Sequence, residues 1–277
     1  MLFRSRQMSD EDRADTVRAV LFDPGSATTG GIALRAADDI VERLGGLVAP
    51  AGADEGRLAS LLLGGGGGTE AILVARGGAH RLPAAAERLA VALGVPVRLV
   101  DIGATSGRLV DAWPDGRCSA HDIPAAAMVP SDATERRRRC DAVLAAVPEL
   151  GRAEAADRLG DLAEAPSRDR DPVNDRLRVA AFADALARMG EALADAPRPV
   201  GAPVVLVGGV AAATSRGALA IDALRPVVGL GLAHILLDPF GAISALGDPE
   251  LASSALDRDG SFTRSAAAAM QIGRAHV

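Results

Sequence analysis

Val97-Arg-Leu-Val-Asp-Ile-Gly-Ala-Thr-Ser-Gly-Arg-Leu-Val-Asp-Ala-Trp113 contains two apolar runs separated by a short polar turn. The pattern predicts a strand, a tight Asp-x-Gly-x-Thr-Ser-Gly turn and a returning strand. The turn places the carboxylate of Asp101, two hydroxyl groups and glycine backbone within a few residues. Main-chain N–H groups of such a turn can bind a phosphate while Asp101 holds a hydrated magnesium ion. A plain hairpin is the alternative, because Asp and Gly are common turn residues.

Two other segments favour the functional interpretation. Val204-Val-Leu-Val-Gly-Gly-Val210 has the pattern of a buried strand that ends in the glycine pair Gly208-Gly209. Near the start of the chain, Asp23-Pro-Gly-Ser-Ala-Thr-Thr-Gly-Gly31 lies between the apolar runs Arg18–Phe22 and Ile32–Leu34. It predicts a second strand–turn–strand with an acid, glycines and paired hydroxyls. An acid at the end of a buried strand suits a magnesium–phosphate site at the edge of a sheet.

The remaining pattern predicts an α/β protein. Residues 37–44 are expected to form a helix that ends at Gly45-Gly46. The apolar run Ala71–Ala75, a helix over Pro83–Gly94 and the strand at Val97 suggest a βαβ unit with parallel strands. Arg117–Ile123 predicts a third strand next to the hairpin, following the turn at Asp115-Gly116.

The second half of the chain is expected to be mainly helical before Val204. Residues 131–170 are charged and helical with breaks, residues 167–175 suggest a polar loop, and Leu177–Ala196 has the spacing of a long helix with one buried face. The run Glu135-Arg-Arg-Arg-Arg-Cys-Asp141 is an anion site on one interpretation. A solvated helix face is the favoured interpretation, because the flanking acids offset the arginines.

Composition excludes several classes of function. The net charge is −6, with five Phe, one Trp and no Tyr, so neither a nucleic-acid partner nor a base-stacking platform is expected. No run approaches the ~18 apolar residues of a membrane span. Two cysteines without a metal or disulfide spacing favour the cytoplasm. The chain has no lysine. This excludes a phosphate-loop lysine, a protein-kinase strand lysine and Schiff-base chemistry.

The ends of the chain differ in character from the rest. Residues 1–7 and 271–277 contain Met1-Leu-Phe-Arg-Ser5 and Gln271-Ile-Gly-Arg-Ala-His-Val277, which a common sequencing-library adapter encodes in frame. On this interpretation the sequence is a metagenomic fragment of a longer gene, cut at both ends. Genuine disordered tails are the alternative.

The two hairpins and the glycine pair resemble the actin–hexokinase–chaperone ATPase superfamily. In that superfamily each domain opens with a strand–turn–strand that embraces phosphates, and a later Gly-Gly turn supports the adenosine. Asp101, Gly103, Thr105 and Ser106 match the second phosphate hairpin, and Gly208-Gly209 match the adenosine turn. Residues 230–247 resemble the closing strand and the Gly-Ala-x-x-Ala-Leu-Gly helix of such proteins.

Within the superfamily the chain is most similar to the MutL-like proteins associated with glutamate mutase, which are thought to reactivate adenosylcobalamin-dependent mutases. Asp23-Pro-Gly-Ser-Ala-Thr-Thr29 is similar to their Asp-x-Gly-Gly-Ala-Thr-Thr-Asp motif. Gly30 replaces the final acid, and Pro24 follows Asp23. The segment between Asp23 and Asp101 is also short for a complete first domain. The hairpin at Asp23 is therefore either a degenerate copy of the phosphate motif, or the true first phosphate hairpin lies upstream of this fragment.

The resemblance implies an actin-like (ribonuclease H-like) fold of mixed sheets flanked by helices. It implies a partial first lobe over residues 16–96, a second lobe over 97–250 and a tail over 251–277. ATP and Mg²⁺ would lie between the lobes, with Asp101 and Asp23 as catalytic acids and metal ligands. The cofactor-binding residues would be Gly25, Thr28, Thr29, Gly103, Thr105, Ser106, Gly107, Gly208 and Gly209.

The implied function is a reactivating or chaperone ATPase with a cobalamin-dependent mutase subunit as its partner. Two other functions stay open. One is a small-molecule kinase of the same fold that acts on a sugar or an acid, with Asp101 or Asp122 as the catalytic acid. The other is a non-catalytic interaction module with decayed nucleotide motifs. We expect nucleotide binding from this chain, but not turnover by the chain alone.

Overall fold

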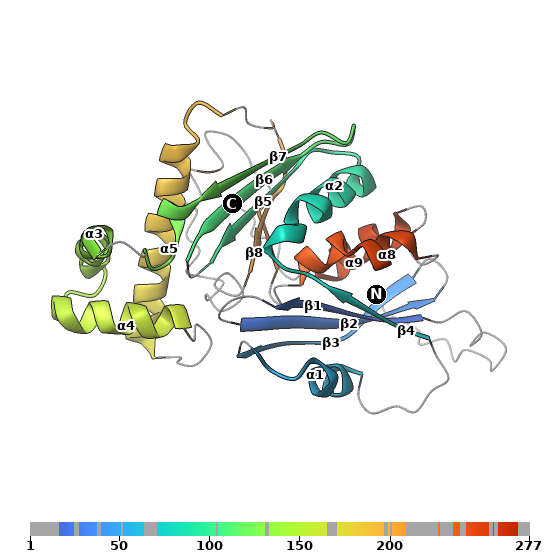
Figure 1. Cartoon of the computed structure of the whole chain (residues 1–277), viewed down its shortest axis with the longest axis horizontal. Helices are drawn as coiled ribbons and strands as arrows, with labels where there is room; N and C mark the ends of the chain where they lie inside the picture. Colours follow the sequence, from blue (N-terminus) through green and yellow to red (C-terminus); the bar gives the residue numbers. More distant parts are fainter. Residues whose placement is uncertain are drawn as a thin grey trace, which may run out of the picture.

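The computed structural model is an α/β protein with two mixed β-sheets flanked by helices (Figure 1). It describes residues 17–24, 28–37, 40–50, 52–63, 71–103, 105–130, 133–164, 171–196, 199, 201–208, 227, 235–238, 242–254, 257 and 260–270.

The first sheet has four strands in the order β3-β2-β1-β4. Their bounds are β1 (Val17–Pro24), β2 (Thr28–Ala37), β3 (Ile40–Pro50) and β4 (Ala71–Arg76). β1, β2 and β3 pair antiparallel, whereas β4 pairs parallel with β1. The sheet therefore opens with the predicted hairpin and is completed by a strand from later in the chain.

The second sheet has five strands in the order β7-β6-β5-β8-β9. Their bounds are β5 (Val97–Ile102), β6 (Gly107–Ala112), β7 (Cys118–Ile123), β8 (Val204–Val207) and β9 (Ile235–Leu237). β5, β6 and β7 form the predicted antiparallel meander, while β8 and β9 add parallel strands beside β5. The carboxyl ends of β5 and β8 consequently lie side by side.

Helices cover both sheets and fill the space between them. Their bounds are α1 (Glu55–Leu62), η2 (Ala79–Arg81), α2 (Leu82–Leu93), η3 (Pro124–Ala126), α3 (Ala133–Leu144), α4 (Arg152–Glu164), α5 (Pro172–Ala192), η4 (Ile243–Gly247), α8 (Pro249–Ser253) and α9 (Ser261–Met270). In Figure 1, α2, α8 and α9 lie between the sheets, α1 lies below the first sheet, and α3, α4 and α5 lie beyond the second.

Alternation along the strands divides the core into three clusters of buried apolar side chains. In β1, Ala19 and Leu21 face the cluster between the sheets, whereas Val20 and Phe22 face α1. In β5, Leu99 also belongs to the cluster between the sheets, whereas Val100 and Ile102 belong to the cluster that contains the buried residues of α5. Residues after 250, expected as a tail, include α9, whose Phe262 is buried in the cluster between the sheets.

Several expected elements have different bounds. The helix expected over residues 37–44 is not found in their described part: Ala37 ends β2, and residues 40–44 belong to β3. The pairing of β2 with β3 shifts register, so that Ala33 pairs with Gly45 and Leu34 with Arg43. This bulge leaves Leu44 as the extra residue, and the glycines that suggested a helix end lie within a strand.

Two further expectations were wrong. β4, α2 and β5 follow each other as predicted, but β4 and β5 belong to different sheets, so they form no βαβ unit. The helix crosses from one sheet to the other. The loop expected up to residue 175 ends earlier, because Asp171 accepts a hydrogen bond from the Val173 N–H and begins α5 with Pro172 in its first turn. Within the described ranges, no helix has the length and apolar character needed to cross a membrane.

Candidate functional site

Asp101 and Gly208 meet at the carboxyl ends of two neighbouring parallel strands. Asp101 is near the end of β5 and pairs with Val207 of β8, and Gly208 follows directly. A Cβ built on Gly208 would stand 2.3 Å from Asp101 Oδ1. The φ of Gly208 is +90°, a conformation that side-chain-bearing residues rarely adopt. The first glycine of the predicted adenosine turn is therefore in direct contact with the predicted metal ligand.

The surroundings of Asp101 favour its neutral form. Burial raises the pKa of this carboxyl to about 7, although the positive charge of Arg108 works in the opposite direction. The residue as a whole is partly exposed, although its carboxyl group is buried. Near neutral pH the group is therefore poised between its two protonation states, and a cation beside it would favour the carboxylate.

The turn between β5 and β6 is closed by its own backbone. The Gly103 N–H donates to the Ser106 carbonyl oxygen over 2.9 Å, so this amide is occupied within the turn. Thr105 and Ser106 are exposed at the tip. Gly107 has no room for a side chain, because a Cβ there would lie 2.6 Å from Ala126 Cβ. The turn consequently offers hydroxyl groups, rather than the Gly103 amide, to a ligand.

A buried arginine holds the loop that supports this turn. The Met128 N–H donates to the Gly103 carbonyl oxygen over 2.9 Å, joining the loop after η3 to the hairpin. Arg139 of α3, which is 1% exposed, donates to the carbonyl oxygens of Ala127 and Met128. Its Nε lies 2.7 Å from Asp184 Oδ2 of α5. Two helices thus fix the position of the hairpin through Arg139.

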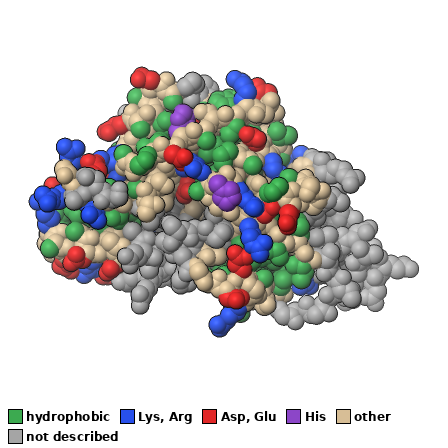
Figure 2. Space-filling view, viewed as in Figure 1, with side chains coloured by type: hydrophobic (Ala, Val, Ile, Leu, Met, Phe, Trp, Pro, Cys, Tyr) green, Lys and Arg blue, Asp and Glu red, His purple; other side chains and the backbone are tan. Residues whose placement is uncertain are grey.

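The arginine run was expected to be a solvated helix face, and this is only partly correct. Arg136, Arg137 and Arg138 are exposed, and Figure 2 shows Arg side chains gathered with acidic ones over α3 and α4 at the left. Arg139, however, is in the core. The helical spacing to the buried Val143, four residues on, is the sequence signal that could have shown this.

The first hairpin is described only in part. In the backbone Asp23 pairs with Gly30 and Pro24 with Thr29, so β1 and β2 do form the expected strand pair. The side chains of Asp23 and Thr28 lie outside the described part of the structure, as do Gly25 and Gly209. Thr29 is described and is 3% exposed. Its side chain is therefore buried, and its role in binding a nucleotide stays a prediction.

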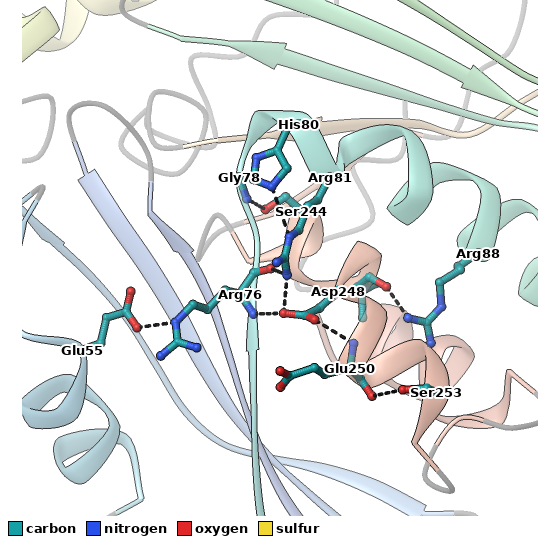
Figure 3. A network of polar contacts seen from close by, with 11 residues as sticks. Glu55, Arg76, Gly78, His80, Arg81, Arg88, Ser244, Asp248, Glu250 and Ser253 are labelled. Atoms are coloured by element: carbon teal, nitrogen blue, oxygen red, sulfur yellow. Dashed lines mark hydrogen bonds and ion pairs between the residues drawn. The ribbon is translucent and has the colours of Figure 1, made fainter.

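The chain passes from the first sheet to the second through a tightly packed connector, Gly77–Arg81 (Figure 3). The Gly77 N–H donates to the Phe22 carbonyl oxygen over 2.5 Å, and the Gly78 N–H donates to Ser244 Oγ over 2.9 Å. A Cβ on Gly77 would stand 1.9 Å from Ser244 Oγ and 2.8 Å from the Ala245 nitrogen. Glycine is therefore required where the connector crosses η4.

Asp248 joins the connector to both neighbouring elements (Figure 3). Its carboxylate accepts hydrogen bonds from the Arg76 N–H over 2.6 Å and the Glu250 N–H over 2.9 Å, and it pairs with the Arg81 guanidinium. Burial acts to raise the pKa of Asp248, but these three donors outweigh it and hold the pKa below its usual value. The ionised side chain thus stabilises the end of β4.

Arg108 is the site residue that sequence reasoning missed. It pairs in the backbone with Asp101 on one side and with Asp122 on the other, so the three side chains form a row across β5, β6 and β7. Its Nε donates to Asp122 Oδ1 over 2.5 Å, and its Nη1 donates to the carbonyl oxygen of Ala79. The sequence signal that could have found it is the symmetry of the predicted hairpin, since pairing Ile102 with Gly107 places Arg108 opposite Asp101.

Comparison with solved structures shows which known fold this architecture matches. The chain is similar to the activator of the 2-hydroxyisocaproyl-CoA dehydratase from Clostridium difficile with bound ADPNP. The match has 15% sequence identity and a TM-score of 0.50, and it covers 94% of this chain and 100% of that one. The chain has the actin-like ATPase fold.

Two further structures with this fold are similar at lower TM-scores. Component A of the (R)-2-hydroxyglutaryl-CoA dehydratase from Acidaminococcus fermentans matches with 15% identity and a TM-score of 0.48, over 90% of this chain and 99% of that one. The ethanolamine utilization protein EutJ from Carboxydothermus hydrogenoformans matches with 15% identity and a TM-score of 0.42, over 84% and 88%. No protein-family model and no curated protein matches the chain. The expected actin-like fold is confirmed, and the MutL-like resemblance stays a prediction.

Proposed function

We propose that the chain binds ATP with Mg²⁺ at the Asp101 hairpin and acts on a partner protein in the cytoplasm. The observation that carries this proposal is the contact between Asp101 and Gly208. It brings an acid, a hydroxyl-bearing turn and a partly exposed glycine to one edge of the second sheet. The carboxyl edge of parallel strands is where α/β folds bind ligands. The dehydratase activator described above carries bound ADPNP, which is consistent with a nucleotide.

The described residues fit this ligand in distinct roles. The Asp101 carboxylate would hold the hydrated metal ion, since Mg²⁺ is usually bound through one or two carboxylates plus waters and phosphate oxygens. The Thr105 and Ser106 hydroxyls would contact phosphate, and Gly208 would let the adenosine approach the backbone. Bound ATP would supply a γ-phosphoryl group open to attack by water, and the Asp101 carboxylate would position that water through the hydrated metal ion.

The first hairpin would complete the site from the other sheet. In this proposal residues 16–96 form a first lobe and residues 97–250 a second lobe. Asp23 and Gly25 would face the nucleotide, while the buried Thr29 would shape the hairpin without touching the ligand. Gly30 in place of an acid leaves Asp101 as the main metal ligand.

The MutL-like resemblance favours a partner protein over a small acceptor substrate, and of the two acids considered for a kinase only Asp101 is suited to act as a base. A kinase of this fold would need a general base near the phosphate, and Asp122 was the second residue considered for that role. Its hydrogen bond to Arg108 holds the pKa of Asp122 below its usual value, so the carboxylate is a weak base. We infer a reactivating or chaperone ATPase, with an adenosylcobalamin-dependent mutase as the partner that the MutL-like resemblance suggests.

Calorimetry with Mg-ATP on the full 277-residue chain tests the proposal. We expect binding by the wild type, and at least a tenfold weaker affinity for Asp101→Ala, because a charge-assisted contact is worth about 1.5–3 kcal/mol. Asp115→Ala is the matched control, since Asp115 lies in the opposite turn of the same meander. Absence of wild-type binding would contradict the proposal and would favour the non-catalytic module.

A second experiment separates the partner from a small acceptor. We expect phosphate release that increases when an inactivated adenosylcobalamin-dependent mutase is added, together with recovery of mutase activity. Phosphate transfer to a sugar or a carboxylic acid, without any response to the mutase, would instead identify a small-molecule kinase.

A further inference from the structure

Arg108 connects the hairpin to the segment that leaves the first sheet. Its Nη1 donates to the carbonyl oxygen of Ala79 in η2, directly after the glycines of the connector. Its Nε donates at the same time to Asp122 on the neighbouring strand. One side chain therefore holds the second sheet to the connector at the position where Asp101 lies.

Both partners of Arg108 are weak enough to be exchanged. The Asp122 side chain is 62% exposed, so this ion pair competes with water and contributes little to stability. The Ala79 carbonyl oxygen is a neutral acceptor, and Ala79 itself is exposed. A phosphate group carries more negative charge than either acceptor and matches the planar fork of a guanidinium.

The charge requirement of the site points to the same residue. Cationic side chains, together with Mg²⁺, stabilise the negative charge of a bound nucleoside triphosphate. This chain has no lysine, so an arginine would have to supply that charge. Among the described residues, Arg108 is the cation whose charge acts on Asp101. Its side chain is 22% exposed, which leaves the guanidinium accessible from solvent.

We infer that Arg108 is a phosphate-binding residue that exchanges the Ala79 carbonyl and the Asp122 carboxylate for a phosphate oxygen of the bound nucleotide. Release of Ala79 then frees the hairpin from the connector, so nucleotide binding alters the link between the two sheets. This inference rests on the proposed nucleotide site at the hairpin and assigns that site its cation.

Variants at Arg108 test the binding role. For Arg108→Met we expect Mg-ATP affinity to fall by about ten- to a hundredfold, while adenosine binds as to the wild type. Arg108→Lys retains the charge but not the fork, so we expect an intermediate loss. Arg117→Met is the matched control. It removes an arginine that pairs with Asp115 over 2.7 Å at the far end of the same meander, and it should leave the Mg-ATP affinity unchanged.

Hydrogen exchange tests the release of Ala79. In the wild type, Mg-ATP should speed amide exchange over residues 78–82, whereas in Arg108→Met exchange there should be fast without nucleotide. Equal Mg-ATP affinities of wild type and Arg108→Met would overturn this inference and leave the proposed function standing. No wild-type binding would overturn both. Should Arg108→Met not fold, wild-type affinity in Arg108→Lys would overturn the inference.

Discussion

The Cα of Gly208 lies against the carboxylate of Asp101, with no space between them for a side chain. A Cβ there would be 2.3 Å from Oδ1, well inside van der Waals contact. Asp101 is the second-last residue of β5 and Gly208 directly follows β8 in the same parallel pair, although the two are far apart in the sequence. Both the acid and the bare backbone at this edge of the sheet therefore depend on one glycine.

Gly208→Ala should both destabilise the protein and displace Asp101. Strain at φ +90° costs about 1 kcal/mol and the clash adds about 1–3 kcal/mol. Gly116→Ala isolates the strain, because Gly116 has a φ of +84° and nothing within 4 Å of its added Cβ. Urea unfolding should show the larger loss for Gly208→Ala, and only this variant should lose Mg-ATP affinity in calorimetry. Equal losses for the two variants would contradict the contact.

The raised pKa of Asp101 predicts a pH-dependent penalty in the folded state. In the unfolded chain this carboxyl ionises near pH 3.8, whereas in the folded protein it stays protonated up to about pH 7. The folded state therefore holds more protons between these values, and the stability contribution of Asp101 falls as pH rises from about 4 to 7. Asp101→Asn should remove this fall and gain on the order of 2–4 kcal/mol over the wild type above pH 7.

Urea unfolding of wild type and Asp101→Asn at several pH values from 4 to 8 measures the effect. The difference between the two proteins isolates Asp101 from carboxyl groups such as Asp248, whose lowered pKa gives the opposite slope. A difference that does not change with pH would show that Asp101 ionises normally in the folded protein.

The hairpin at Asp101 could be predicted because its signals are local. Apolar strands bounded by a Gly-rich turn determine a two-stranded pairing without help from the rest of the chain. The placement of Gly208 beside Asp101 depends on how β8 joins the sheet, which is a long-range pairing that the sequence pattern only suggested. The crossing of α2 from one sheet to the other was not predictable for the same reason, since strand–helix–strand order is equally compatible with one sheet or with two.

The connector should tolerate almost no added volume. Gly77→Ala places a methyl group 1.9 Å from Ser244 Oγ and 2.8 Å from the Ala245 nitrogen, so we expect a loss of about 3 kcal/mol or more. Ser244→Ala removes the acceptor of the Gly78 N–H and should cost about 1–2 kcal/mol. In the double variant the hydroxyl clash is relieved but the backbone clash remains. Chemical denaturation should therefore show less than the sum of the two losses, and strict additivity would contradict this packing.

Arg139→Met should loosen the hairpin from behind. It leaves the buried carbonyl oxygens of Ala127 and Met128 without a donor and removes one of the two arginines that pair with Asp184, which keeps its ion pair with Arg188. We therefore expect a loss of about 2–4 kcal/mol. Arg137→Met, on the exposed side of the same helix, should change stability by no more than about 0.5 kcal/mol.

Hydrogen exchange distinguishes a local role of Arg139 from general destabilisation. The Met128 N–H donates to the Gly103 carbonyl oxygen. The substitution Arg139→Met should increase the exchange rate of this amide more than it increases the exchange rates of the amides in β8. Uniformly faster exchange over the second sheet would show that Arg139 supports the fold as a whole and not the hairpin in particular.

Arg139 and Arg108, which contact the hairpin and its supporting loop, were harder to predict than the hairpin itself. A run of four arginines has the composition of a solvated surface, and only its position relative to the buried Val143 marks the last arginine as interior. Arg108 was missed for a different reason. Its partners Ala79 and Asp122 come from the connector and from a neighbouring strand, so its role exists only once the sheet and the connector are assembled.

One apolar cluster is shared by both sheets, with Leu21 from β1, Leu99 from β5 and Phe262 from α9 among its members. Cutting the chain at residue 96 would leave each product with one wall of this interior exposed to water. Neither half should persist as a folded fragment, and the two should unfold together in a single cooperative transition. A wide opening between the sheets would expose these apolar side chains to water. The motion that this architecture permits is a small rotation of one sheet relative to the other, during which the cluster stays buried.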